Sequence, residues 1–229
     1  MDKKMLCTKL ILKDLISKAP IINPIYRSAF LSNPESDFIY IPIQKNAHTW
    51  TVNELLARGF TNKTFFHNPE YINAKDTIVV LRDPIERWIS GMAEYFSIAL
   101  WDMKLLDTST DVIDEEMLEI IINKTELDQH TRSQTDFIKK INMNKLIFFN
   151  FHDNYTMRFR DFLNSRGLLQ DGVNWAKLNS TDTKFRTPHK TLRWVTFFNE
   201  VLKNPQYLKK IQNFYEEDQK LIDSVKFYQ

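Results

Sequence analysis

Three short apolar runs, each followed by a segment with helical periodicity, limit the folds open to this chain more than any other feature. The runs are DFIYIPI (37–43), TIVVL (77–81) and KLIFFNF (145–151). Strands that alternate with helices are typical of α/β proteins, in which helical connections join parallel strands. TIVVL has apolar residues on both faces, as a central strand covered by helices on both sides requires. We therefore predict an α/β fold with a central parallel sheet flanked by helices.

The segments around these runs suggest how the chain is organised. Residues 5–18 have apolar positions at helical spacing and predict a short docking helix, with a membrane-surface helix as the alternative. Three prolines in residues 19–36 predict an irregular connector, so residues 1–36 form an N-terminal helix and connector. We predict a single α/β domain over residues 37–229. It contains an acidic helical insertion around residues 102–128, where nine Asp and Glu face two Lys. Residues 192–222 predict one or two helices, parted near Asn204-Pro205.

Composition excludes several classes of protein. Hydrophobic residues make up 43% of the 229 residues, which is enough for a core and argues against global disorder. A net charge of +2 gives no reason to expect a nucleic-acid partner. The one cysteine, Cys7, cannot form an internal disulfide, and the five histidines are scattered, so no metal site is expected. Charged residues interrupt the N-terminal apolar stretch, and no apolar run reaches membrane-spanning length. We expect a soluble, cytoplasmic protein without a membrane span.

The first candidate site is the stretch FIYIPIQKNAHTW (38–50), where a strand should end and a helix begin. Backbone N–H groups at a helix start favour an anion, and Lys45 adds a full positive charge. Asn46, His48 and Thr49 supply further donors. Taken alone, this pattern also fits an ordinary surface lysine. The ATP-binding loop G-x-x-x-x-G-K-[ST] is absent, because both glycines are missing and Asn46 follows the lysine, which disfavours an ATP or GTP hydrolase.

The second candidate site is TIVVLRDPIERWISGM (77–92), which runs from a buried strand into a helix. Arg82 lies at the carboxyl end of the strand, where open α/β sheets bind ligands, and its guanidinium can hold a phosphate bidentately. Asp83 and Pro84 mark the start of the helix. Ser90 is predicted to share a polar face with Arg87 and Glu94, away from the apolar stripe, so its hydroxyl can reach the same phosphate. The apolar stripe of this helix comprises Ile85, Trp88, Ile89, Met92 and Phe96.

These two motifs resemble those of the sulfotransferases that use 3′-phosphoadenosine 5′-phosphosulfate (PAPS). RDPIERWIS (82–90) looks like the family's 3′-phosphate-binding signature, and QKNAHTW (44–50) resembles its 5′-phosphosulfate loop. KLNSTDTKF (177–185) and FYEEDQKLI (214–222) are more loosely similar to the Asn-Ser segment and the terminal Tyr-x-x-Asp helix of carbohydrate sulfotransferases. The resemblance implies a P-loop-NTPase-like sheet and transfer of a sulfuryl group from PAPS to a hydroxyl of a small molecule or carbohydrate. The product PAP is released, and no metal is needed.

The resemblance also implies roles for individual residues. Lys45 would stabilise the charge that develops on the bridging oxygen as PAP departs. Arg82 and Ser90 would bind the 3′-phosphate. Lys184, Arg186 and Lys190 form a late basic stretch that closes over the nucleotide in family members, so Arg186 is a further candidate; a solvated basic loop is the alternative. The remaining residues expected to surround the phosphosulfate are Asn46, Ala47, His48, Thr49 and Trp50.

The lysine loop departs from the family pattern at three positions. Gln44 stands in place of proline, Ala47 in place of glycine, and His48 in place of a small hydroxyl or thiol residue. Alanine is a mild replacement for glycine only where φ is negative. His48 either donates to the sulfate or fills space. Trp50 and Trp101 can stack on adenine or line the acceptor site, whereas Trp88 is assigned to the core.

The acceptor's proton requires a base, and histidine is the residue type best suited near neutral pH. His67, in TFFHNPEY, lies between the two motifs, where several heparan sulfate sulfotransferases place a catalytic residue. His130, in LDQHTRSQTDFI, resembles the D-x-H…Q segment of several carbohydrate sulfotransferases. Glu54 and Glu94 are further candidates, and each histidine has a surface or packing role as its alternative.

Two other functions stay open at this point. One is a P-loop-like kinase or nucleotide-binding enzyme, and the other is a PAP-binding sulfotransferase homologue without activity. The sequence does not identify the acceptor or the oligomeric state.

Overall fold

The structure, a computed structural model, describes residues 3–19, 29–64, 69–102, 109–152, 154–168 and 188–228. Within them the chain divides into two units. The sheet unit comprises residues 29–64, 69–83, 133–152, 154–168 and 217–228. The helical unit comprises residues 3–19, 84–102, 109–132 and 188–216. The domain boundary predicted near residue 36 stays a prediction.

The sheet unit is built on a five-stranded mixed sheet with the order β3-β1-β2-β4-β5. Its parallel part consists of β2 (Phe38–Ile41), β4 (Asp76–Leu81) and β5 (Leu146–Asn150). These are the three strands that the apolar runs predicted, so the α/β fold class is confirmed. Antiparallel strands β1 (Ala29–Ser32) and β3 (Thr61–Thr64) extend the sheet beyond β2. The sequence pattern missed both, and β1 lies in the segment predicted as an irregular connector.

Side chains alternate between the two faces of this sheet, as the pleat of a strand requires. Phe38 and Tyr40 of β2 join one apolar cluster, whereas Ile39 and Ile41 join another. The neighbouring β4 alternates in the same way, with Ile78 and Val80 on the first face and Val79 and Leu81 on the second. Both faces of the central strands are therefore buried, which explains why their sequences are apolar at nearly every position.

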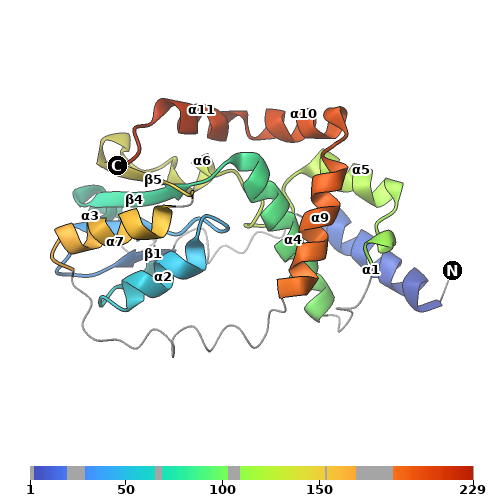
Figure 1. Ribbon diagram of the computed structural model, residues 1–229, viewed down its shortest axis with the longest axis horizontal. Helices are drawn as coiled ribbons and strands as arrows, with labels where there is room; N and C mark the ends of the chain where they lie inside the picture. The colour runs from blue at the N-terminus through green and yellow to red at the C-terminus, as the bar shows by residue number, and fades with distance from the viewer. Residues whose placement is uncertain are drawn as a thin grey trace. The chain divides into compact units, whose positions relative to one another are not determined.

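Helices cover both faces of the sheet. On the first face lie α2 (His48–Leu56) and α7 (Tyr155–Ser165), which bury Leu55 and Phe159 there. On the second face lie α3 (Pro69–Ala74), α6 (Thr135–Ile138) and α11 (Glu216–Ser224). A short helix, η4 (Met143–Lys145), immediately precedes β5. Figure 1 shows α2 and α7 on one side of the strands and α11 on the other. The loops after β2 and β4 emerge at the same edge of the parallel strands.

The helical unit is formed by α1 (Lys3–Lys18), α4 (Pro84–Asp102), α5 (Glu115–Lys124), α9 (Pro188–Val201) and α10 (Pro205–Phe214), with a short helix, η3 (Thr110–Val112). Pro84 is the first residue of α4, and the predicted apolar stripe of this helix is buried or partly buried in one core. Trp88 is fully buried there, in agreement with its predicted assignment.

The C-terminal helices α9 and α10 separate where the sequence predicted, but a second break at Tyr215 separates α10 from α11, so three helices occur where one or two were predicted. The Asn204 side chain caps α10 by accepting from the backbone N–H of Gln206 at 2.9 Å. The described part of the acidic segment contains the helices η3 and α5, and α5 exposes Glu115 and Glu116 while it buries Met117. No helix within the described ranges is both long and apolar enough to cross a bilayer.

Candidate functional site

The loop between β2 and α2 has an unusual backbone. Lys45 has φ of 68° and Ala47 has φ of 55°, and Thr125 is the one other described non-glycine residue with positive φ. The left-handed conformation costs an L-residue about 1 to 2 kcal/mol. Ala47 in place of glycine is therefore not a mild change in this loop. Strained residues of this kind cluster where a protein binds or transforms a ligand, so the loop is a site candidate on geometry alone.

Helix α2 begins without a side-chain cap. Ala47 is its N-cap residue and offers no side-chain acceptor to the first turn, which comprises His48, Thr49 and Trp50. The Ala47 carbonyl accepts from both the backbone N–H and the hydroxyl of Thr51, each at 3.0 Å. The N–H groups of a first helical turn point along the axis, and the helix dipole makes this end positive. The start of α2 is therefore suited to an anionic group.

Arg82 follows β4 and lies against this loop. Its Nη1 donates to the carbonyl oxygen of Lys45 at 3.1 Å, and its guanidinium carbon lies 5.0 Å from the centroid of the Phe151 ring. Both cationic side chains are half-buried. The structure thus brings together the two residues that the separate motifs singled out. They meet at the carboxyl ends of adjacent parallel strands, which is where open α/β sheets bind ligands.

Asn46 lies inside the sheet unit, with no exposed surface. Its Nδ2 donates to the carbonyl oxygen of Val80 at 2.7 Å and to Oε1 of Gln134 at 2.6 Å. Both amide hydrogens are therefore used within the protein. The side chain anchors the lysine loop to β4, and the sequence prediction that it donates to a ligand finds no support in this arrangement.

His48 and Trp50 occupy different surroundings at the start of α2. The His48 Nε2 lies 3.5 Å from Nε2 of Gln44, at the limit of a hydrogen bond. The Trp50 ring packs edge-on against Tyr155 of α7, with centroids 5.6 Å apart, and the Arg160 guanidinium lies 5.3 Å from its centroid. Trp50 thus contributes to packing on the first face of the sheet, whereas Thr49 is exposed.

Glu54 is fully buried in α2, and two arginines bind its carboxylate. Arg58 Nη1 and Arg160 Nε each lie 2.9 Å from Oε1. Arg160 Nη2 lies 3.3 Å from Oε2. A carboxylate held in this way has no access to a substrate proton, which argues against Glu54 as the base. Burial raises the pKa of the Tyr40 and Tyr155 hydroxyls, which belong to the apolar cluster on the first face of the sheet.

In the helical unit, α4 carries Ser90 and Arg87. Ser90 is half-buried. Arg87 is fully buried and donates to the backbone carbonyl of Arg132, with a longer bond of 3.4 Å to that of Gln129. The polar face predicted for this helix is thus largely internal, because Glu94 is also only 4% exposed. Arg87 fixes the loop of residues 129–132 against α4.

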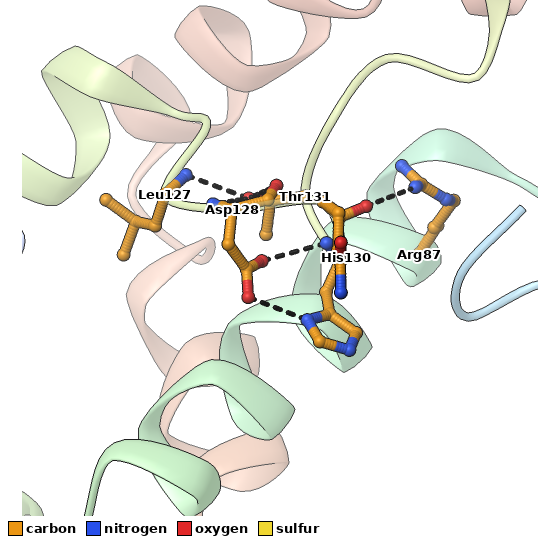
Figure 2. Close-up of polar contacts among 6 residues, drawn as sticks. Arg87, Leu127, Asp128, His130 and Thr131 are labelled. Carbon is orange, nitrogen blue, oxygen red and sulfur yellow. Dashed lines mark hydrogen bonds and ion pairs between the residues drawn. The ribbon is translucent and has the colours of Figure 1, made fainter. Parts of the chain in front are cut away.

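His130 lies in that loop, and Figure 2 shows its ring directed at Asp128. Nδ1 of His130 is 2.7 Å from Oδ2 of Asp128, whose other oxygen accepts from the His130 backbone N–H at 2.8 Å. A carboxylate at Nδ1 fixes the proton on that nitrogen and leaves Nε2 to accept a proton. Burial, followed by the charge of Asp128, raises the pKa of the nearby Tyr95 to about 12. This dyad has the geometry of a positioned general base.

Several predicted site residues lie outside the described residues. These are His67, Lys184 and Arg186, and with them the KLNSTDTKF segment. Lys190 lies in α9 and Trp101 in α4, but their side chains are not among those described. Their predicted roles stay predictions.

No specific role was predicted for Gln134, whose side chain contacts both Arg82 and Asn46. The signal that could have found it is the glutamine of the D-x-H…Q segment, Asp128 to Gln134.

Comparison with protein-family models, curated proteins and solved structures finds no match for this chain. In the described part of the chain, no group of three or more His, Cys, Asp and Glu residues could hold a metal ion.

Proposed function

We propose that this protein transfers a sulfuryl group from PAPS to an acceptor hydroxyl, such as that of a carbohydrate, and releases PAP. The observation that carries the proposal is the contact between Arg82 and the Lys45 carbonyl beside the uncapped start of α2. Two cations and a helix N-terminus at one sheet edge suit a ligand with two separate anionic groups. PAPS is such a ligand, and the resemblance of both motifs to sulfotransferases selects it over others. The proposed sheet class is P-loop-NTPase-like, and the proposed location is the cytoplasm.

In the proposed reaction, the acceptor oxygen attacks sulfur while the bond between sulfur and the bridging phosphate oxygen breaks. The electron pair of that bond stays on the phosphate of PAP. Lys45 and the first-turn amides of α2 stabilise this developing charge, with Thr49 as a further donor. Arg82 and Ser90 are assigned to the 3′-phosphate by resemblance. Little covalent work falls to the protein, so positioning of the two substrates supplies most of the catalysis.

A histidine accepts the acceptor's proton in this proposal. His130 is the better supported candidate, because Asp128 holds its Nδ1 and leaves Nε2 as the proton acceptor. His67 is the alternative. A His130→Ala variant should lose sulfuryl transfer while it keeps its affinity for PAP, whereas the same result for His67→Ala would assign the base there.

A thermal-shift titration tests the cofactor. PAP at a hundredfold excess over its Kd should raise the free energy of unfolding by about 2.7 kcal/mol. ATP with magnesium should have a much smaller effect. Arg82→Ala should abolish the PAP shift. The matched control is Arg166→Ala. Arg166 lies in the same unit, but it bonds to Asp37, which precedes the amino-terminal end of β2, opposite to the end that carries the lysine loop.

The results separate the three candidate functions. An equal shift with ATP and magnesium would favour a nucleotide-binding enzyme of another class. PAP binding without transfer of labelled sulfate to any hydroxyl acceptor would identify an inactive homologue, for which the strain at Ala47 is the motivating observation. Absence of any PAP shift in wild type would reject the sulfotransferase assignment.

A further inference from the structure

The side-chain amide of Gln134 joins the two halves of the candidate phosphate site. Gln134 is fully buried. Its Oε1 accepts from the backbone N–H of Arg82 at 3.0 Å, and its Nε2 donates to the backbone carbonyl of Arg82 at 2.8 Å. The same Oε1 accepts from Nδ2 of Asn46 at 2.6 Å. One side chain therefore contacts the arginine turn and the lysine loop together.

The end of the β4 pairing explains why Arg82 needs this partner. The pairing of β4 with β2 ends at Val79 opposite Ile41, whereas on the β5 side the Leu81 carbonyl still accepts from the Phe151 N–H at 2.7 Å. Past the end of this pairing, the backbone N–H and C=O of Arg82 bond to the Gln134 side chain, and such bonds matter because buried backbone polar groups without partners are costly. The Gln134 amide presents one acceptor and one donor side by side, so it replaces a neighbouring strand at this residue.

Asn46 lies next to Gln134 and is held at the same end of β4. The pairing of β2 with β4 ends at Ile41 opposite Val79. Asn46 then donates to the carbonyl of the next residue, Val80, and to Gln134. The lysine loop is thus tied to β4 at the point where its own strand has ended.

Asp218 of α11 fixes Gln134 in turn. This carboxylate is fully buried and accepts from the backbone N–H of Gln134 at 2.7 Å and of Thr135 at 2.9 Å. It also accepts from the Ser133 hydroxyl at 2.6 Å. The segment that carries Gln134 is therefore held by three hydrogen bonds to one side chain, at the start of α6.

We infer that Gln134 is a positioning residue, which fixes Arg82 and the Lys45 loop in the arrangement that binds the nucleotide phosphates. The inference rests on the proposed function for the identity of the ligand. The bonds themselves are independent of that identity. A site held by buried hydrogen bonds is preorganised, and displacement of a binding group by about 1 Å can cost 100-fold in activity.

The test compares Gln134→Leu with Ile72→Ala. Leucine has a similar volume but makes no hydrogen bond, and Ile72 is a buried residue of the same unit on α3, before β4 begins. Two quantities are measured under conditions where both variants are folded. One is hydrogen exchange of the Arg82 amide and of the amides of residues 45–50, and the other is the Kd for PAP.

In Gln134→Leu we expect the Arg82 and loop amides to exchange at least about tenfold faster, and the Kd for PAP to rise by about 10- to 100-fold. Ile72→Ala should change neither quantity. Unchanged exchange at Arg82, or an unchanged Kd for PAP in a wild type that binds it, overturns the inference. A rise in Kd of the same size in the control also overturns it, because general destabilisation would then explain the loss.

Failure of the proposed function gives a different result. If wild type binds no PAP, the sulfotransferase assignment fails, and hydrogen exchange alone decides whether Gln134 fixes Arg82 and the loop. Should Gln134→Leu fail to fold, Gln134→Glu takes its place. Glutamate keeps the acceptor for Arg82 and Asn46 but, when ionised, loses the donor to the Arg82 carbonyl. The same two measurements then apply.

Discussion

Gly91 in the middle of α4 offers a test in which helix propensity and tertiary packing predict opposite results. Alanine is a better helix former than glycine by about 1 kcal/mol, so local preference predicts that Gly91→Ala stabilises the protein. In the structure, a Cβ at this position would lie 2.4 Å from the carbonyl oxygen of His130 and 2.9 Å from Cγ2 of Thr131. The close approach of the His130 loop to α4 therefore requires glycine.

The magnitude follows from the nature of the atoms involved. Overpacking of a core costs about 1 to 3 kcal/mol, and a clash with backbone belongs at the upper end because no side-chain rotation relieves it. Subtracting about 1 kcal/mol for helix propensity leaves a net loss of about 2 kcal/mol in the free energy of unfolding. For a chain of this length that corresponds to a fall in Tm of about 4 to 8 °C.

Thermal and urea denaturation followed by circular dichroism measure this loss. Gly167→Ala is the comparison, because Gly167 has φ of +73° but no atom lies within 4 Å of an added Cβ. Its loss should be about 1 kcal/mol and come from the backbone alone. A Tm for Gly91→Ala equal to or above that of wild type would refute the close packing of the His130 loop on α4.

Three further predictions concern stability. Ala47→Gly should raise the free energy of unfolding by about 0.5 to 1 kcal/mol in urea denaturation, because it relieves a positive φ; a loss would contradict the strained loop. Arg58→Met should cost about 3 kcal/mol, since it leaves the buried Glu54 carboxylate with one partner fewer, whereas Arg160→Met, at a side chain 47% exposed, should cost about 1 kcal/mol or less; equal losses would contradict this order. Tyr95 has a pKa raised to about 12, so the unfolded chain ionises first, near pH 10. Stability is therefore lost as pH rises from about 10 to 12, and Tyr95→Phe should reduce that loss by about 1 to 2 kcal/mol in denaturation measured across this range, with parallel curves as the contrary result.

The parallel centre of the sheet could be predicted because its signal is local. Each central strand is buried on both faces, which requires a continuous apolar run, and three such runs stood out in the sequence. The strands β1 and β3 gave no such signal. They are four residues long and lie at or near the edge of the sheet, where β3 exposes Thr61, Asn62 and Lys63.

The proximity of Lys45 and Arg82 could also be expected, because the carboxyl ends of neighbouring parallel strands lie side by side. The roles of Arg87 and Glu54 could not. Each looked like a surface charge or a candidate site residue in its own helix, yet each is fully buried against a segment distant in sequence. Arg87 binds carbonyls 42 and 45 residues away, and Glu54 binds Arg160 at a separation of 106 residues.

Three features could be predicted from local sequence patterns: the α/β class, the order of strand, lysine loop and helix, and the position of Arg82 at the end of a strand. Periodicity and helix-start residues specify these features within a few neighbouring positions. The left-handed backbone at Ala47 and the contact of Gln134 with both halves of the site became visible only in the folded chain. Gln134 lies 52 residues from Arg82 and 88 from Asn46 in the chain, and hydrogen bonds over such separations exist only after the sheet and its covering helices have packed.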